Sequence, residues 1–226
     1  MNKIPRRQQN RLDKENRILA AALKVFSQSG YSGASMDAVA AEAGLTKPTL
    51  YQYFESKEQL FASMMLQKRD YMLLPFRAPG SDDMVVQLHL FAWAYTDTVM
   101  QQDMLSLARL TIGEVQRFPE IGRAYQAAGP DRVLDGLMGY LSSHRAAGRL
   151  RFDDAELAAE DLWGLILSAP RTKALYNPGL RHGRTELARY VHNGLRVFLR
   201  AYSTNPETDL VILEGLKAPI SKQVTE

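Results

Sequence analysis

The sequence predicts an all-α protein, with a small N-terminal three-helix domain followed by a larger helical body. Three observations predict this class. Apolar residues recur at helical spacing along most of the chain, glycines and prolines interrupt the pattern at intervals, and no alternating strand run of useful length occurs. The 226 residues are 46% hydrophobic, which is enough for a sizeable core.

The first helix is predicted over residues 13–29, and Gly30 is expected to end it because glycine readily adopts the left-handed backbone of a helix C-terminus. A continuous apolar face supports the assignment. It consists of Ile18, Leu19, Ala22, Leu23 and Phe26.

Two short helices follow around a tight turn. Ser35 can cap a second helix that ends at Gly44, and Thr46 can cap a short third helix that ends near Phe54. Gly44 suits the left-handed backbone of the turn between them. This arrangement predicts a helix-turn-helix. Ser56 and a glutamine three residues later then form a capping box for a longer helix that reaches about Leu74, before Pro75 and Pro79-Gly80.

The rest of the chain predicts a helical body, punctuated by prolines that include Pro170. The expected helices are 82–101, 103–117, 120–127, 130–147, 154–168 and 184–201. The domain prediction is a basic flexible arm over 1–12, a helix-turn-helix domain over 13–58, a helical ligand-binding and dimerisation domain over 59–201, and a C-terminal tail over 202–226. Most of the tail is expected to be frayed, although its apolar residues 211–213 can dock.

Basic charge is concentrated at the N-terminus. Residues 1–80 carry a net charge of +5 and residues 81–226 one of −2, and six cations lie within the first 17 residues. Such asymmetry fits either a polyanionic partner or a solvated tail. The chain has no cysteine, and no stretch resembles a signal peptide or a transmembrane helix, so a cytoplasmic protein is expected.

The third helix has a polar-tipped surface. Lysine and hydroxyl groups at Lys47, Thr49, Tyr51 and Tyr53 can donate to phosphate oxygens or base edges. The alternative is that both tyrosines are core residues. Because they lie about 200° apart on a helix, both cannot face one core.

Residues from about Asn16 to Met64 resemble the TetR family of transcriptional regulators. The resemblance rests on the Gly-Leu-Thr-Lys turn at 44–47, the Leu-Tyr-Gln-Tyr-Phe run at 50–54 and the Ser-Lys-Glu-Gln-Leu run at 56–60. It implies a repressor that binds a palindromic operator as a homodimer and responds to a small-molecule effector. The DNA-binding residues that it implies are Ser35, Thr46, Lys47, Thr49, Tyr51, Tyr53 and Lys57.

Two further stretches, 109–120 and 148–159, resemble the C-terminal domain of the AefR-like branch of the family. An effector cavity needs apolar walls and a few polar groups. Arg109 is its candidate anion-binding group, although pairing with Glu114 or Asp103 at a surface is equally open. The pocket candidates are Trp93, Arg109, Ile112, Gln116, Tyr125, Tyr140, Trp163 and Ile166.

The last two long helices carry continuous apolar faces. The family resemblance implies that they pair with their two-fold mates, while burial inside the chain itself is the alternative reading. The dimer-interface candidates are Leu162, Leu165, Tyr190, Val191, Leu195 and Phe198.

Catalytic patterns are missing from the sequence. The four histidines have no metal-ligand spacing, and no glycine-rich phosphate loop or nucleophile motif occurs, so no enzyme, metal or cofactor is expected. The alternative function is a small-molecule-binding helical protein or enzyme that does not bind an operator.

Overall fold

The computed structural model describes residues 5–77 and 82–219, and these residues confirm the all-α prediction. They form no strand, and Leu150 and Ser203 make an isolated bridge. None of their helices is long and apolar enough to cross a membrane. The predictions for residues 1–4, for Pro79-Gly80 and for 220–226 lie outside the described residues.

The chain forms two compact units that do not follow the predicted linear domain boundaries. Unit 1 comprises Met1–Lys68 and Gln102–Gly129, and unit 2 comprises Arg69–Gln101 and Pro130–Glu226. The predicted boundary between 58 and 59 therefore misses a second segment of unit 1, which lies inside the predicted body.

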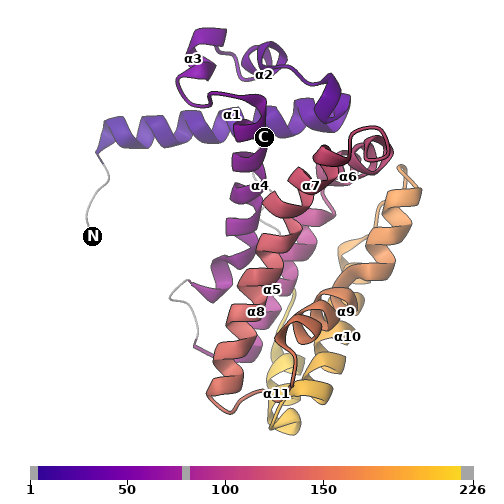
Figure 1. Ribbon diagram of the computed structural model, residues 1–226. Helices are drawn as coiled ribbons and strands as arrows, with labels where there is room; N and C mark the ends of the chain where they lie inside the picture. Colours follow the sequence, from indigo (N-terminus) through magenta and orange to yellow (C-terminus); the bar gives the residue numbers. More distant parts are fainter. Residues whose placement is uncertain (1–4, 78–81, 220–226) are drawn as a thin grey trace. The chain divides into compact units, whose positions relative to one another are not determined.

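Unit 1 is built on the long helix α1, with α2 and α3 on the same side of it (Figure 1). Its helices are α1 (Arg6–Gly33), α2 (Met36–Glu42), α3 (Lys47–Tyr51), the first turns of α4 (Lys57–Leu73), α6 (Gln102–Glu114) and α7 (Pro119–Ala128).

Helix α1 begins earlier than the sequence predicts. Residues 6–12 are helical, so the expected flexible arm is wrong for them. No glycine or proline interrupts the stretch after Pro5, and Gln9 donates a 2.9 Å hydrogen bond to Asp13 one turn later. Gly30 adopts φ +70° and breaks the helix where the sequence predicts its end, and one further turn follows.

The core of unit 1 joins segments far apart in the sequence. Phe26, Tyr31 and Phe61 form an aromatic cluster with ring-centroid distances of 5.2–5.8 Å. Met104 and Leu107 of α6 are buried in the same apolar cluster. Because α6 covers α1 in this way, α6 and α7 belong to the N-terminal unit rather than to the body.

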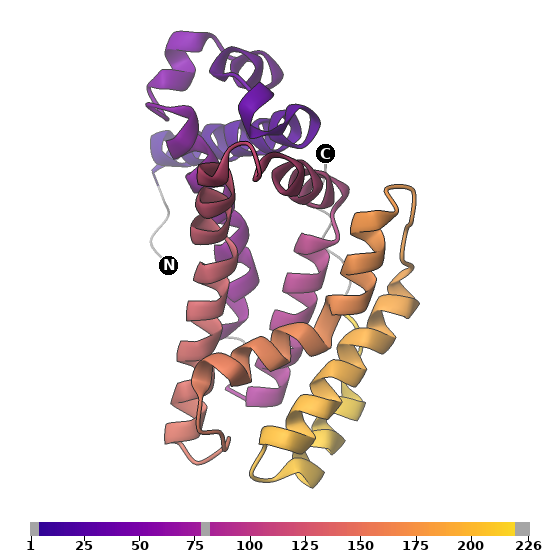
Figure 2. The same cartoon turned by 45° about the vertical axis from the view of Figure 1, so that its right-hand side comes forward.

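Unit 2 is a separate helical core in which α9 and α10 lie side by side (Figure 2). Trp93, Phe91 and Phe198 are among its fully buried side chains. Its elements are the 3₁₀ turn η1 (Leu74–Phe76), α5 (Met84–Val99), α8 (Pro130–Ala146), α9 (Ala155–Tyr176), α10 (Arg184–Tyr202) and α11 (Pro206–Gly215), together with the last turn of α4.

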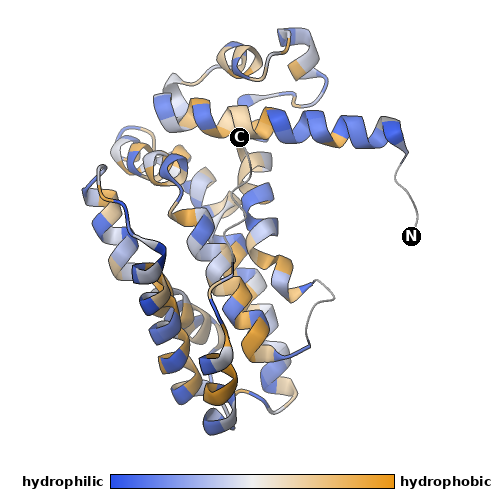
Figure 3. Cartoon of the chain, turned by 180° about the vertical axis from the view of Figure 1, so that it is seen from behind, coloured by the Kyte–Doolittle hydropathy of each residue, from blue (hydrophilic) through white to orange (hydrophobic). Residues whose placement is uncertain are grey.

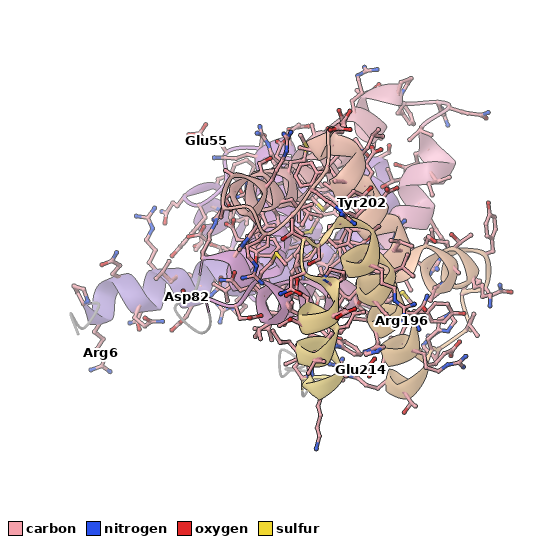
Figure 4. The ribbon with its side chains drawn as sticks, turned by 90° about the horizontal axis from the view of Figure 1, so that it is seen from below. Arg6, Glu55, Asp82, Arg196, Tyr202 and Glu214 are labelled. Carbon is pink, nitrogen blue, oxygen red and sulfur yellow. The ribbon has the colours of Figure 1, made fainter. Side chains whose placement is uncertain are left out.

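Two predictions for unit 2 are wrong. Helix α9 continues through Pro170, which is buried. Burial of its apolar ring offsets the free-energy cost of the hydrogen bond that a proline removes from a helix. The tail, expected to be mostly frayed, contains α11, which docks on α10. The expected docking of 211–213 is confirmed for Leu213, which is fully buried. Figure 4 labels Arg196 and Glu214 on these two neighbouring helices.

Candidate nucleic-acid interface

The turn between α2 and α3 has the geometry that the sequence predicts. The Ser35 hydroxyl caps α2 by accepting a 3.1 Å hydrogen bond from the Ala38 amide. Gly44 adopts φ +62°, and the Leu45 amide then donates to the Ala40 carbonyl at 2.8 Å. A glycine is needed here because a β-carbon disfavours this backbone conformation.

Helix α3 turns Leu50 inward and Tyr51 outward. Leu50 is fully buried in the core of unit 1, whereas Tyr51 is 42% exposed. Consecutive helical residues lie about 100° apart, so a short helix anchored by Leu50 must project its neighbour to one side. The core alternative is therefore excluded for Tyr51.

Three other predicted DNA-binding residues, Thr46, Lys47 and Thr49, lie at the start of α3. The Thr46 and Thr49 hydroxyls share a 2.9 Å hydrogen bond, so Thr46 pairs with a side chain instead of capping the helix. The exposed Lys47 ammonium lies 2.9 Å from an Asp37 carboxylate oxygen. This hydrogen bond and the carboxylate charge raise the pKa of Lys47, so the lysine stays cationic.

Tyr53 occupies an intermediate position. Its ring packs against the apolar cluster of unit 1 and remains partly exposed, and the guanidinium of Arg11 lies 5.9 Å from the ring centroid. No sequence pattern indicates this contact, since the two residues are 42 positions apart.

Lys57 is engaged within the protein. Its ammonium donates to the carbonyls of Tyr31 and Ala34 at 2.8 and 3.2 Å and lies 4.6 Å from the Tyr31 ring centroid. The predicted phosphate contact therefore competes with an internal role, in which Lys57 holds the end of α1 to the start of α4. At the same junction the Ser56 hydroxyl accepts from the Gln59 amide at 3.2 Å, as the capping box predicts.

Four of the predicted pocket residues lie in unit 1. Arg109 is half-buried and donates to the Ser106 hydroxyl at 2.9 Å, and Tyr125 packs partly against the apolar cluster. Ile112 is 63% exposed and Gln116 is also exposed. A pocket role is wrong for these two, because neither side chain lies in an enclosed space.

The other four predicted pocket residues lie in unit 2, where Trp93 and Ile166 are part of the buried apolar core. The Trp93 indole donates to Nε2 of His89 at 3.2 Å, and the Arg184 guanidinium lies 4.0 Å from its ring centroid. Tyr140 stacks on Phe76 with centroids 3.8 Å apart. Burial raises the pKa of the Tyr140 phenol, so its hydroxyl stays protonated and donates to Gln87 at 2.7 Å.

Trp163 borders a hollow of about 340 Å³ in unit 2. Its indole donates to the Tyr95 hydroxyl, and the two rings meet edge to face at 5.6 Å. The remaining lining residues are not among the pocket residues that the sequence predicts. They all lie on α9 and, apart from Leu167, are polar or small. They are Glu160, Gly164, Leu167, Ser168, Arg171 and Thr172.

The dimer-interface candidates separate into two groups. Four are at most 1% exposed within the chain's own core, so their side chains offer no surface to a second copy, and the prediction needs correction for Leu162, Val191, Leu195 and Phe198. Leu165 and Tyr190 remain partly exposed. The helix faces that look outward carry Leu157, at 58% exposed, and Val197, at 38%.

Two family models match the chain. Residues 18–64 match the model of bacterial regulatory proteins of the tetR family, and residues 86–204 match the C-terminal domain of AefR-like transcriptional repressors. The HTH-type transcriptional regulator RutR of Escherichia coli O157:H7 is 42% identical over 134 residues, 58% of this chain and 56% of RutR. UidR of Escherichia coli K12 is 41% identical over 63 residues, 28% of this chain and 32% of UidR. The chain thus spans about half of RutR and a third of UidR.

Solved structures match over a larger share. A TetR-family transcriptional regulator from Mesorhizobium loti is 30% identical with a TM-score of 0.68, and the match covers 85% of this chain and 98% of that one. The flavonoid-responsive regulator FrrA has the same identity and coverage, with a TM-score of 0.62. With the tetR-type turn at Gly44 and the AefR-like match over more than half of its length, this chain belongs to the TetR family of transcriptional regulators.

Proposed function

We propose that this protein is a ligand-responsive repressor that binds a palindromic operator as a homodimer. The observation that carries the proposal is the surface of α3, on which Tyr51 and Lys47 are exposed while Leu50 anchors the helix in the core. Because Leu50 anchors α3 in the core, the exposed side of the helix can enter the major groove while unit 1 keeps its fold.

The polar groups of the turn suit a DNA duplex. The Tyr51 hydroxyl and the Lys47 ammonium can donate to phosphates, and a lysine also suits guanine acceptors. The Ser35 hydroxyl accepts from its own helix and still has a proton to donate. Asp37 shields Lys47 in the free protein, so DNA binding exchanges one anionic partner for another.

The proposed dimer uses the outward faces of α9 and α10. Leu157 and Leu165 lie two turns apart on α9, and Tyr190 and Val197 lie two turns apart on α10, so each pair shares one helix face. A two-fold arrangement buries the same patch on both copies and presents two α3 helices to half-sites about 34 Å apart. Val197→Arg is expected to convert the dimer to a monomer in light scattering, while Val211→Arg, at a 74% exposed position on α11, leaves the mass unchanged.

The proposed effector site is the hollow beside Tyr95 and Trp163. The aromatic side chains of Tyr95 and Trp163 suit an effector with a planar ring. Arg171 and the hydroxyls of Ser168 and Thr172 can bind polar substituents on that ring. Because the similar regulator FrrA is described as flavonoid-responsive, a flavonoid series is the first set of compounds to titrate. Binding should fall at least tenfold in Trp163→Ala, and equal binding to that variant would place the effector elsewhere.

DNA binding is tested with duplexes selected from a random library. The wild-type protein is expected to select an inverted repeat with nanomolar affinity that weakens steeply as salt rises. Tyr51→Ala should weaken binding at least tenfold without loss of helical circular dichroism. Tyr176→Ala is the matched control, because this tyrosine is 83% exposed and lies in unit 2. Failure to select any duplex would favour a small-molecule-binding protein without an operator.

A further inference from the structure

A cationic face runs along the N-terminal half of α1. At about 100° per residue, Arg6, Arg17, Lys14 and Arg11 fall within an arc of about 140°, and the two carboxylates of this stretch lie just outside its edges. Figure 3 shows that this half of the helix is predominantly hydrophilic. The helix therefore places these four cations, which are separated along the sequence, on one side of α1.

These cations are available to a partner. Arg6, Arg11 and Arg17 are exposed, and none of the four makes an ion pair with a carboxylate in the described part of the chain. Elsewhere in unit 1, Lys24 and Lys47 do pair, with Glu42 at 2.7 Å and Asp37 at 2.9 Å. Figure 4 shows the Arg6 side chain at the outer end of α1, extending away from the helix.

The face is continuous with the proposed operator surface. Arg11, at one edge of the arc, lies over the ring of Tyr53, which directly follows α3 and its neighbour Gln52. Arg11 lies near the middle of the cationic face, which spans about 16 Å of α1 from Arg6 to Arg17, a length that corresponds to about five base pairs of duplex.

We propose that this cationic face binds phosphates of the DNA flanking the half-site that α3 reads. The inference rests on the proposed function and extends it, because the contact lies outside the helix-turn-helix. Arginine and lysine side chains on a rigid helix neutralise phosphates without reading bases, so the contact is independent of flank sequence. A membrane surface fits less well, since the exposed apolar residue of this stretch, Leu12, lies outside the arc.

The test compares two duplexes, the selected inverted repeat alone and the same repeat extended by about ten random base pairs on each side. Wild-type protein should bind the extended duplex about tenfold more tightly. Arg6→Gln/Arg17→Gln should lose that gain. The slope of log affinity against log salt should fall by about 3.6, because the dimer loses two phosphate contacts per protomer and each contributes about 0.9. Glutamine keeps helix propensity, so circular dichroism should not change.

The control variant is Arg151→Gln/Lys173→Gln, which removes two exposed cations from unit 2 and should keep the wild-type slope. If wild-type protein binds both duplexes equally and the α1 variant keeps its salt slope, the flank contact is wrong while the repressor proposal stands. If wild-type protein binds neither duplex, the repressor proposal itself fails and this inference fails with it.

Discussion

Gly194 of α10 packs directly against the main-chain carbonyl of Leu165 in α9. A β-carbon at Gly194 would lie 2.5 Å from the Leu165 carbonyl oxygen and 2.7 Å from its carbon. Main-chain atoms in a packed helix cannot move aside as a flexible side chain can. The contact therefore fixes how closely the two longest helices of unit 2 approach.

The Gly194→Ala substitution should lower the free energy of unfolding by about 1–3 kcal/mol, because the added methyl group forces the helices apart. Urea denaturation measures the change. Gly139→Ala in α8 is the matched control, since a β-carbon added there would meet no neighbouring atom within 4 Å, and it should be stabilising by up to about 1 kcal/mol. Equal stability of the two variants would refute the close-packing argument.

Lys57→Met should lower stability by about 1–3 kcal/mol, because the partly buried carbonyls of Tyr31 and Ala34 lose their charged donor. Lys24→Met removes only an exposed ion pair and should change stability by less than about 1 kcal/mol. A purely phosphate-binding Lys57 would behave differently: DNA affinity would fall while the urea midpoint stayed at the wild-type value.

Asp37→Asn should tighten binding to the selected duplex about three- to tenfold at low salt, since it releases Lys47 and removes a negative charge beside the phosphates. Fluorescence anisotropy gives the affinity. Asp135→Asn, which removes an exposed carboxylate 3.9 Å from Arg132 in α8, should leave DNA affinity unchanged. Weaker binding by Asp37→Asn would mean that the carboxylate positions the turn instead of masking Lys47.

Acidification should destabilise the protein through His89. Burial lowers the pKa of His89 from 6.5 to about 4, and His192 of α10 adds a smaller repulsion. Between these two pKa values the unfolded chain binds more protons than the folded one, so stability falls as the pH is lowered through that window. A protonated His89 also cannot accept the Trp93 indole hydrogen bond.

His89→Gln keeps an acceptor near Trp93 and removes the titration. The urea midpoint of the wild-type protein should therefore fall more between pH 7.5 and pH 5 than that of the variant. Burial also lowers the pKa of His144, so the variant should retain part of the pH dependence. Parallel pH profiles for the two proteins would exclude His89 as a contributor.

Local features of unit 1 could be predicted from the sequence. The cap at Ser35, the left-handed Gly44 and the inward Leu50 each depend on neighbours within about five positions, which helix periodicity and turn chemistry describe. The outward direction of Tyr51 then follows from Leu50.

Long-range features could not be predicted in the same way. Lys57 meets carbonyls 23 and 26 positions earlier, so its internal role depends on tertiary packing. An apolar stripe indicates that a helix face is buried, but it does not show whether the chain itself or a second copy buries it. Leu162 and Phe198 are therefore predicted to lie in an interface, whereas they lie in the core of the chain. Pro170 looked like a helix end because the sequence does not reveal that its ring is packed.

The two-segment composition of unit 1 limits how this regulator can be rearranged. Met104 and Leu107 complete a core that the first 68 residues leave open, so a fragment ending at Lys68 would expose apolar surface and should aggregate or unfold. A chimera that transfers operator specificity between relatives must therefore contain residues 102–129 together with the first segment of unit 1. The alternative is to exchange only the surface residues of α3. Evolution of new specificities by simple exchange of N-terminal gene segments is disfavoured by the same constraint.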